Sequence, residues 1–159
     1  MTQINTPQDP QRRSLLIGLG AGGLAVVGMT LVPRAVLANP EDVKMAIEER
    51  IGDAATMDGR ISLELPQIAE NGNTVPIAFE VDSPMTESDY VKVVHIFAEK
   101  NPLPNVASFY FTPRSGKARA STRMRLLKTQ NIVAVAEMSD GSVYMAKTEV
   151  KVTIGGCGG

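Results

Sequence analysis

The chain of 159 residues has a single cysteine, a single histidine and no tryptophan, and these shortages exclude several kinds of site. A disulfide within the chain needs a second cysteine, so no internal disulfide holds the fold. A closed zinc site takes about four ligands, which one histidine and one cysteine do not supply. A lone histidine makes a Ser-His-Asp triad improbable, and no phosphate-binding loop or paired-carboxylate pattern stands out. We therefore expect no metal, no cofactor and no catalytic residues.

The sequence also lacks a strong charge of one sign, because 16 basic residues oppose 17 acidic ones. Nothing in this balance favours nucleic-acid binding. One stretch, 114–128, nevertheless holds six bases and no acid. Alternation along a strand puts four of these bases on one face: Lys117, Arg119, Arg123 and Arg125. Small and apolar residues lie on the opposite face. Two interpretations stay open, a solvated face that guards a sheet edge and a docking surface for acidic partners or a sulfonate-bearing arm.

Residues 1–38 have the pattern of an export signal. Arg12 and Arg13 precede an uncharged stretch, 15–32, and small residues at 36–38 mark a cleavage site. Paired arginines before a glycine-rich apolar core resemble a twin-arginine signal, which exports folded proteins across the bacterial inner membrane. The alternative is an uncleaved membrane anchor, since the stretch is barely long enough to span a bilayer. We expect cleavage after Ala38 and a periplasmic protein.

The rest of the chain predicts an all-β fold with one short helix. Asn39, Pro40 and two acids favour a helix start, and apolar residues recur at helical spacing over 41–51. Beyond Gly59 the period changes to two, and Asp140-Gly141 is a strong hairpin signal. We expect strands near 61–65, 75–81, 90–98, 108–112, 118–128, 132–138 and 142–154. Residues 39–154 are thus predicted to form an immunoglobulin-like antiparallel β-sandwich with a short N-terminal helix.

The expected strand 90–98 carries apolar residues on both faces. Such a strand is covered twice, which is weak support for a partner subunit packing there. His95 lies in phase with Val91, Val93 and Phe97, so a structural or interface position is favoured over a catalytic one.

The chain ends in a glycine-rich segment, 155–159, that contains its only cysteine. Cys157 stands between two pairs of glycines: Gly155, Gly156, Gly158 and Gly159. Glycine has no Cβ and few conformational limits, so we expect a thin, flexible arm. Extended, the arm spans about 10 Å from Ile154 to Cys157. The alternative is a terminal tail without a role.

The arm presents a thiol but nothing that activates it. A free cysteine has a pKa of about 8.5, and no lysine, arginine or histidine lies in the arm to lower it. The terminal carboxylate further disfavours the thiolate. Activation must then come from whatever the arm enters, which is the behaviour of a carrier rather than of an enzyme.

The terminal run from Lys151 to Gly159, KVTIGGCGG, resembles the end of the SoxY family, the sulfur carriers of the bacterial thiosulfate-oxidising multienzyme system. The resemblance implies that Cys157 holds pathway intermediates in the periplasm as thiosulfonate and persulfide adducts. It implies a heterodimer with a SoxZ-like β-sandwich subunit. It also implies a c-type cytochrome that loads thiosulfate, a sulfate thiol hydrolase and, where present, a sulfane dehydrogenase.

Two other functions remain possible from the residues alone. The carboxylate of Gly158-Gly159 could act as an acyl-type carrier, as in ubiquitin-like sulfur carriers, although that chemistry needs ATP, which an exported protein lacks. Alternatively, the domain could be a structural subunit whose thiol only forms an intermolecular disulfide.

Overall fold

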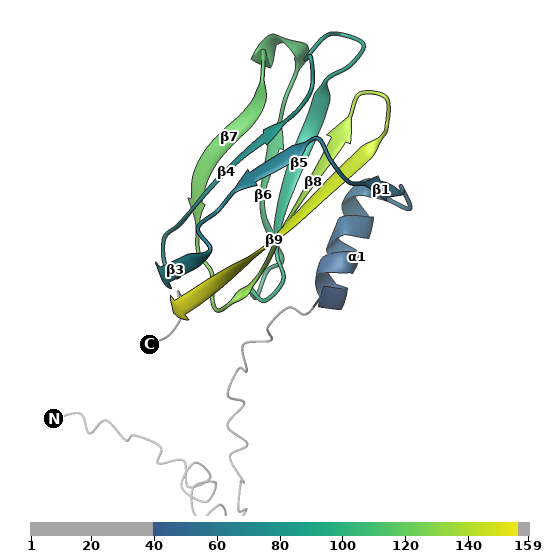
Figure 1. Ribbon diagram of the computed structural model, residues 1–159. Helices are drawn as coiled ribbons and strands as arrows, with labels where there is room; N and C mark the ends of the chain where they lie inside the picture. The colour runs from purple at the N-terminus through teal and green to yellow at the C-terminus, as the bar shows by residue number, and fades with distance from the viewer. Residues whose placement is uncertain (1–39, 156–159) are drawn as a thin grey trace, which may run out of the picture. The chain divides into compact units, whose positions relative to one another are not determined.

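The computed structural model describes residues 40–155, which form one helix and nine strands (Figure 1). None of the helices in this range is long and apolar enough to cross a membrane. A 3-10 turn at Pro113–Ser115 joins two of the strands. In chain order the elements are α1 (Pro40–Ile51), β1 (Thr56–Met57), β2 (Ile61–Glu64), β3 (Ile68–Asn71), β4 (Val75–Val81), β5 (Val91–Ala98), β6 (Asn105–Tyr110), β7 (Ala118–Met124), β8 (Gln130–Met138) and β9 (Val143–Ile154).

The strands form two sheets, which confirms the predicted β-sandwich with one short helix. The larger sheet has the order β1-β9-β8-β5-β6 with β3 also on β9, and the smaller has the order β2-β4-β7. Most strand pairs are antiparallel, as predicted, whereas the short strands β1 and β3 pair with β9 in parallel. A hairpin would make two strands antiparallel, but no hairpin joins β1 or β3 to β9. Between β1 and β3 the chain forms β2, which belongs to the other sheet.

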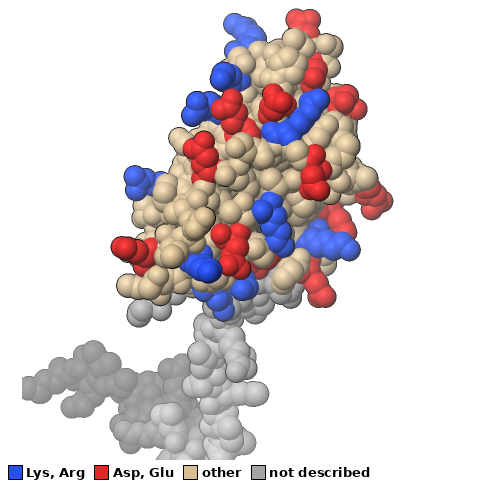
Figure 2. Space-filling view, viewed as in Figure 1, with Lys and Arg blue, Asp and Glu red and all other residues tan. Residues whose placement is uncertain are grey.

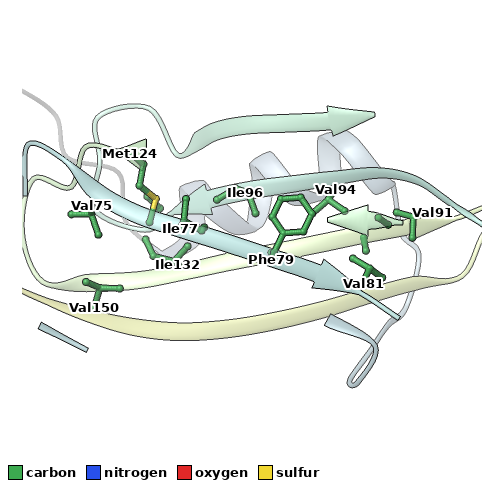
Figure 3. Close-up of a cluster of buried hydrophobic side chains, with 14 of the residues drawn as sticks. Val75, Ile77, Phe79, Val81, Val91, Val94, Ile96, Met124, Ile132 and Val150 are labelled. Atoms are coloured by element: carbon green, nitrogen blue, oxygen red, sulfur yellow. The ribbon is translucent and has the colours of Figure 1, made fainter. Parts of the chain in front are cut away.

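The main core lies between the two sheets. Strand β4 alternates strictly, and its inward residues Val75, Ile77, Phe79 and Val81 are buried against side chains of the larger sheet (Figure 3). The Phe79 ring also meets the Phe109 ring edge-on at 5.1 Å between centroids. An edge-to-face aromatic pair of this kind adds to the stability that burial alone provides.

Helix α1 covers the outer face of the larger sheet, opposite the main core (Figure 1). Its Val43 and Ile47 pack against Phe97, Val133 and Val135. The second apolar face of β5, interpreted from sequence as weak support for a partner subunit, is thus covered at Phe97 by the chain's own helix. That interpretation was therefore wrong for this part of the strand.

A β-bulge in β5 changes which residues share a face. The register with β8 shifts between Val91 and Val93, and Val91 joins the main core. His95 and Phe97 lie on the other face, which carries α1. His95 is therefore in phase with Phe97, as expected, but not with Val91.

Candidate functional site

The predicted site residues lie at the end of β9. Ile154 and Gly155 are described by the structure, whereas Gly156, Cys157, Gly158 and Gly159 lie outside the described residues. The predicted flexibility of the arm stays a prediction. The part of the candidate site open to inspection is therefore the root of the arm, which we define as Ile154 and Gly155 with the segments that contact them.

One side of the root is built by the turn after β3. Asn71 pairs with Ile154 in the parallel ladder, and the Gly72 N–H donates to the Ile154 carbonyl at 2.7 Å. The Gly72 carbonyl in turn accepts from the Leu126 N–H at 2.8 Å. Gly72 thus links the end of β9 to the loop after β7.

That loop forms the other side of the root. Strand β7 ends at Met124 rather than near 128, because the next N–H groups leave the ladder with β4: Leu126 donates to Gly72 and Leu127 donates to Asn101. A Cβ built on Gly155 would collide with the Leu127 carbonyl oxygen.

Two side-chain amides hold the loop in place. Asn101 donates from Nδ2 to the Arg125 carbonyl at 2.8 Å and accepts on Oδ1 from the Leu127 N–H at 3.1 Å. Gln130, only 1% exposed, donates from Nε2 to the same Oδ1 at 3.0 Å. Its Oε1 accepts from the Lys100 N–H at 2.7 Å. Such a fully bonded buried amide fixes backbone positions.

Asn101, Gln130 and the role of Gly72 were not predicted from the sequence. Gln130 opens the apolar run of β8, so a polar residue at a buried strand position was the available signal. Nothing in the sequence pointed from Gln130 to Asn101, which is 29 residues away in the chain.

The basic stretch lies on β7 and the loop after it, next to the root. As predicted, Arg119, Arg123 and Arg125 are exposed on the face opposite the buried Ala118 and Met124. Lys117 pairs with Glu80 at 3.5 Å, an exposed contact that contributes little. Figure 2 shows basic and acidic side chains interspersed over the visible face. The docking interpretation of this stretch stays a prediction.

His95 lies away from the arm, in the middle of β5. Its side chain is buried, and its Nδ1 is 2.7 Å from the Ser108 Oγ on β6. Burial lowers the pKa of His95 below its usual value, and the positive charge of Arg50 lowers it further against the opposing effect of Glu137. This placement supports the structural interpretation of His95.

The buried neutral histidine predicts a pH-dependent stability. Because the pKa of His95 is lower in the folded state than in the unfolded state, the unfolded chain binds more protons below about pH 6.5. We expect the contribution of His95 to lower the free energy of unfolding as the pH falls below about 6.5, the usual pKa of histidine. Urea titrations at several pH values measure this, and His95→Gln should flatten the dependence over that range. An unchanged slope in the variant would contradict the assignment.

Among residues 40–155, Glu99 is the other buried titratable side chain, and both of its carboxylate oxygens accept hydrogen bonds. It is 5% exposed and accepts from Asn131 Nδ2 at 2.7 Å and from Lys147 Nζ at 2.5 Å. Burial alone would raise the pKa of Glu99, but these hydrogen bonds outweigh it and hold the pKa below its usual value. Glu99, the residue after β5, is thus tied to β8 and β9. Within residues 40–155, acidic, histidine and cysteine side chains nowhere gather in a group of three that could hold a metal ion.

Comparison with known proteins gives one family match and several structural matches. The model of a family described as sulfur oxidation protein SoxY matches residues 47–157. The structure of the sulfur carrier protein SoxY from Chlorobium limicola f thiosulfatophilum is similar, with 36% sequence identity and a TM-score of 0.62. The match covers 72% of this chain and 98% of that one. A search of curated protein sequences gives no match.

Superoxide reductases share the fold. The superoxide reductase (neelaredoxin) from Ignicoccus hospitalis has 14% identity and a TM-score of 0.51 over 73% of this chain and 94% of its own. A putative superoxide reductase from Thermotoga maritima has 16% identity and a TM-score of 0.52 over 62% of this chain and 93% of its own. At this level of identity the likeness is one of fold alone.

Proposed function

This chain belongs to the SoxY family of sulfur carrier proteins, and from that premise we propose that it carries thiosulfate-derived sulfur covalently on Cys157. The observation that supports the proposal most directly is the extent of the family match, which runs through residue 157. The matched region thus includes the only cysteine thiol in the chain.

The proposed cycle needs a thiol that is sterically accessible and that has no activating group of its own. Oxidative loading joins the Cys157 sulfur to the outer sulfur of thiosulfate, and two electrons leave to a c-type cytochrome. A sulfate thiol hydrolase then adds water at the terminal sulfonate, which releases sulfate and leaves a persulfide on Cys157. The sulfane sulfur is oxidised further by a sulfane dehydrogenase or is passed on. Each reaction takes place in a partner, so this chain supplies only the attachment point.

The fold contributes a rigid base for this chemistry. Strand β9 pairs with β8 along most of its length and with β3 near its end, so the residue before the arm is held by its neighbours. We propose that the carrier works in the periplasm as a heterodimer with a SoxZ-like subunit. Export by the twin-arginine route fits this assembly, since a folded carrier can bring along a partner that has no signal of its own.

Extending the chain by one residue after Gly159 separates thiol chemistry from carboxylate chemistry. A thiol carrier should keep more than about half of its rate of thiosulfate loading, because Gly158 and Gly159 still separate Cys157 from the added residue. A carboxylate carrier should lose all activity, because the reacting group has moved. Loading is measured as cytochrome reduction with the protein as the varied component. Complete loss in the extended protein would contradict the thiol proposal.

A further inference from the structure

Five of the described glycines differ in conformation and surroundings. Gly52, Gly59, Gly116 and Gly141 have positive φ, and a Cβ on any of them would meet nothing within 4 Å. Those positions favour glycine for its backbone conformation. Gly155 is the reverse case, since its φ lies outside that left-handed region and a Cβ would collide with the Leu127 carbonyl.

We propose that Gly155 is a positioning residue: its missing side chain lets the end of β9 pass under the Leu127 carbonyl, so the root is clamped and any pivot of the arm lies beyond Gly155. This inference rests on the proposed carrier function for its consequence, but its structural content stands on the contacts at the root.

Three sets of contacts make the clamp. The Gly72 N–H bonds the Ile154 carbonyl, and the Gly72 carbonyl bonds the Leu126 N–H, so the root and the loop share one backbone bridge. Thr129 adds a second tie, because its Oγ1 accepts from the Val152 N–H at 2.9 Å. Asn101 binds the Arg125 carbonyl and the Leu127 N–H, so the backbone leading into the Leu127 carbonyl is held and limits how far this carbonyl can move from a Cβ at position 155.

The clamp sets where the thiol can go. If the arm pivoted at Ile154, Cys157 would range over a radius of about 10 Å, whereas with Gly155 held the chain can move only beyond it and the radius falls to about 7 Å. The volume searched by the sulfur falls to about a third, since it scales with the cube of that radius. A smaller volume raises the effective concentration of the thiol at the entrance of a docked partner.

A nitroxide spin label on Cys157 distinguishes a clamp from a joint by the sign of the effect. The label attaches at one position only, because the chain has one cysteine. In Gly155→Ala the new Cβ should push the Leu127 peptide away and release the root, so the label should become more mobile. If Gly155 acts instead as a free joint, alanine restricts the backbone and the label becomes less mobile, which would overturn the proposal.

Amide hydrogen exchange at Leu126 gives a second readout that does not involve the arm. Losing the bridge through Gly72 should speed exchange of the Leu126 N–H about tenfold in Gly155→Ala. Gly158→Ala is the matched control, because it makes the same chemical change in the arm without touching the clamp. Equal Leu126 exchange in Gly155→Ala and the unaltered protein would overturn the proposal.

Asn101→Ala removes the bonds to the Arg125 carbonyl and the Leu127 N–H while Gly155 is retained. It should also speed amide exchange at Leu126 and increase the mobility of the label, so the clamp stays testable if Gly155→Ala does not fold.

In both variants alkylation of Cys157 by iodoacetamide should proceed at an unchanged rate, whereas kcat/KM for thiosulfate loading by the cytochrome should fall about threefold or more. Failure of the unaltered protein to load would contradict the carrier function but leave the label and exchange results to decide the clamp.

Discussion

Cys157→Ser is expected to reduce thiosulfate-dependent turnover of a reconstituted system to the level seen without the carrier. A serine oxygen cannot form the S–S bond that joins thiosulfate to the carrier, and the chain contains no other cysteine to replace it. Turnover is measured as sulfate released and as cytochrome reduced. The loss should appear in both, because loading precedes hydrolysis.

The same variant should fold normally, because residue 157 lies beyond Ile154, the last residue of β9. Its thermal midpoint should stay within about 1 °C of the unaltered protein, as for most changes outside a packed core. Retention of more than about a tenth of the turnover by the serine variant would place the reacting group elsewhere in the chain.

Phe97→Ala should lower the free energy of unfolding by about 3–5 kcal/mol. Phe97 is fully buried and fills the layer between the larger sheet and helix α1, where it packs with Val43 and Ile47. Removing the ring opens a cavity under the helix as well as losing apolar contact. Urea unfolding measures the change, and the loss of far-ultraviolet helical signal reports whether α1 detaches.

Tyr110→Ala is the matched control for Phe97→Ala. It also removes a large aromatic ring from a strand of the same sheet, but Tyr110 is 74% exposed on the edge strand β6. We expect a change of less than about 0.5 kcal/mol. A loss below about 1 kcal/mol for Phe97→Ala would contradict the packing of α1 on this face.

The sequence predicted those parts of the fold where side-chain chemistry repeats. The helix was located to within a residue, since apolar spacing and capping signals agree there. The hairpin at Asp140-Gly141 also forms: Gly141 has φ +85°, and Asp140 Oδ1 accepts from the Ser142 N–H at 2.9 Å. In the helix and in the hairpin, the residues that form the sequence pattern also stabilise the local backbone conformation.

The missed elements have no such pattern. Strands β1 and β3 were not predicted, because β1 has two residues and β3 buries only Ala69; both exist through backbone pairing with β9. Strand β6 begins at Asn105, three residues before the predicted start, since its side chains are half-buried without alternation. A bulge such as the one before Val93 also leaves no mark on composition.

The candidate site divides in the same way. Cys157 and its glycines were found from the sequence, because a lone cysteine among glycines is a local pattern. The root could not be found, since it assembles Gly72, Asn101, Leu127 and Gly155 from four separate parts of the chain. Its key contact involves a backbone carbonyl and an absent side chain, neither of which a sequence displays.

The mass of the intact protein from cells grown on thiosulfate tests the central claim most directly. A sulfur carrier should be recovered partly as sulfane and sulfonate adducts, all on Cys157 and all removed by a thiol reductant. The adducts should be missing from Cys157→Ser prepared in the same way. Recovery of only free thiol and disulfide-linked dimer, with no sulfur adduct at any stage of growth, would contradict the carrier function.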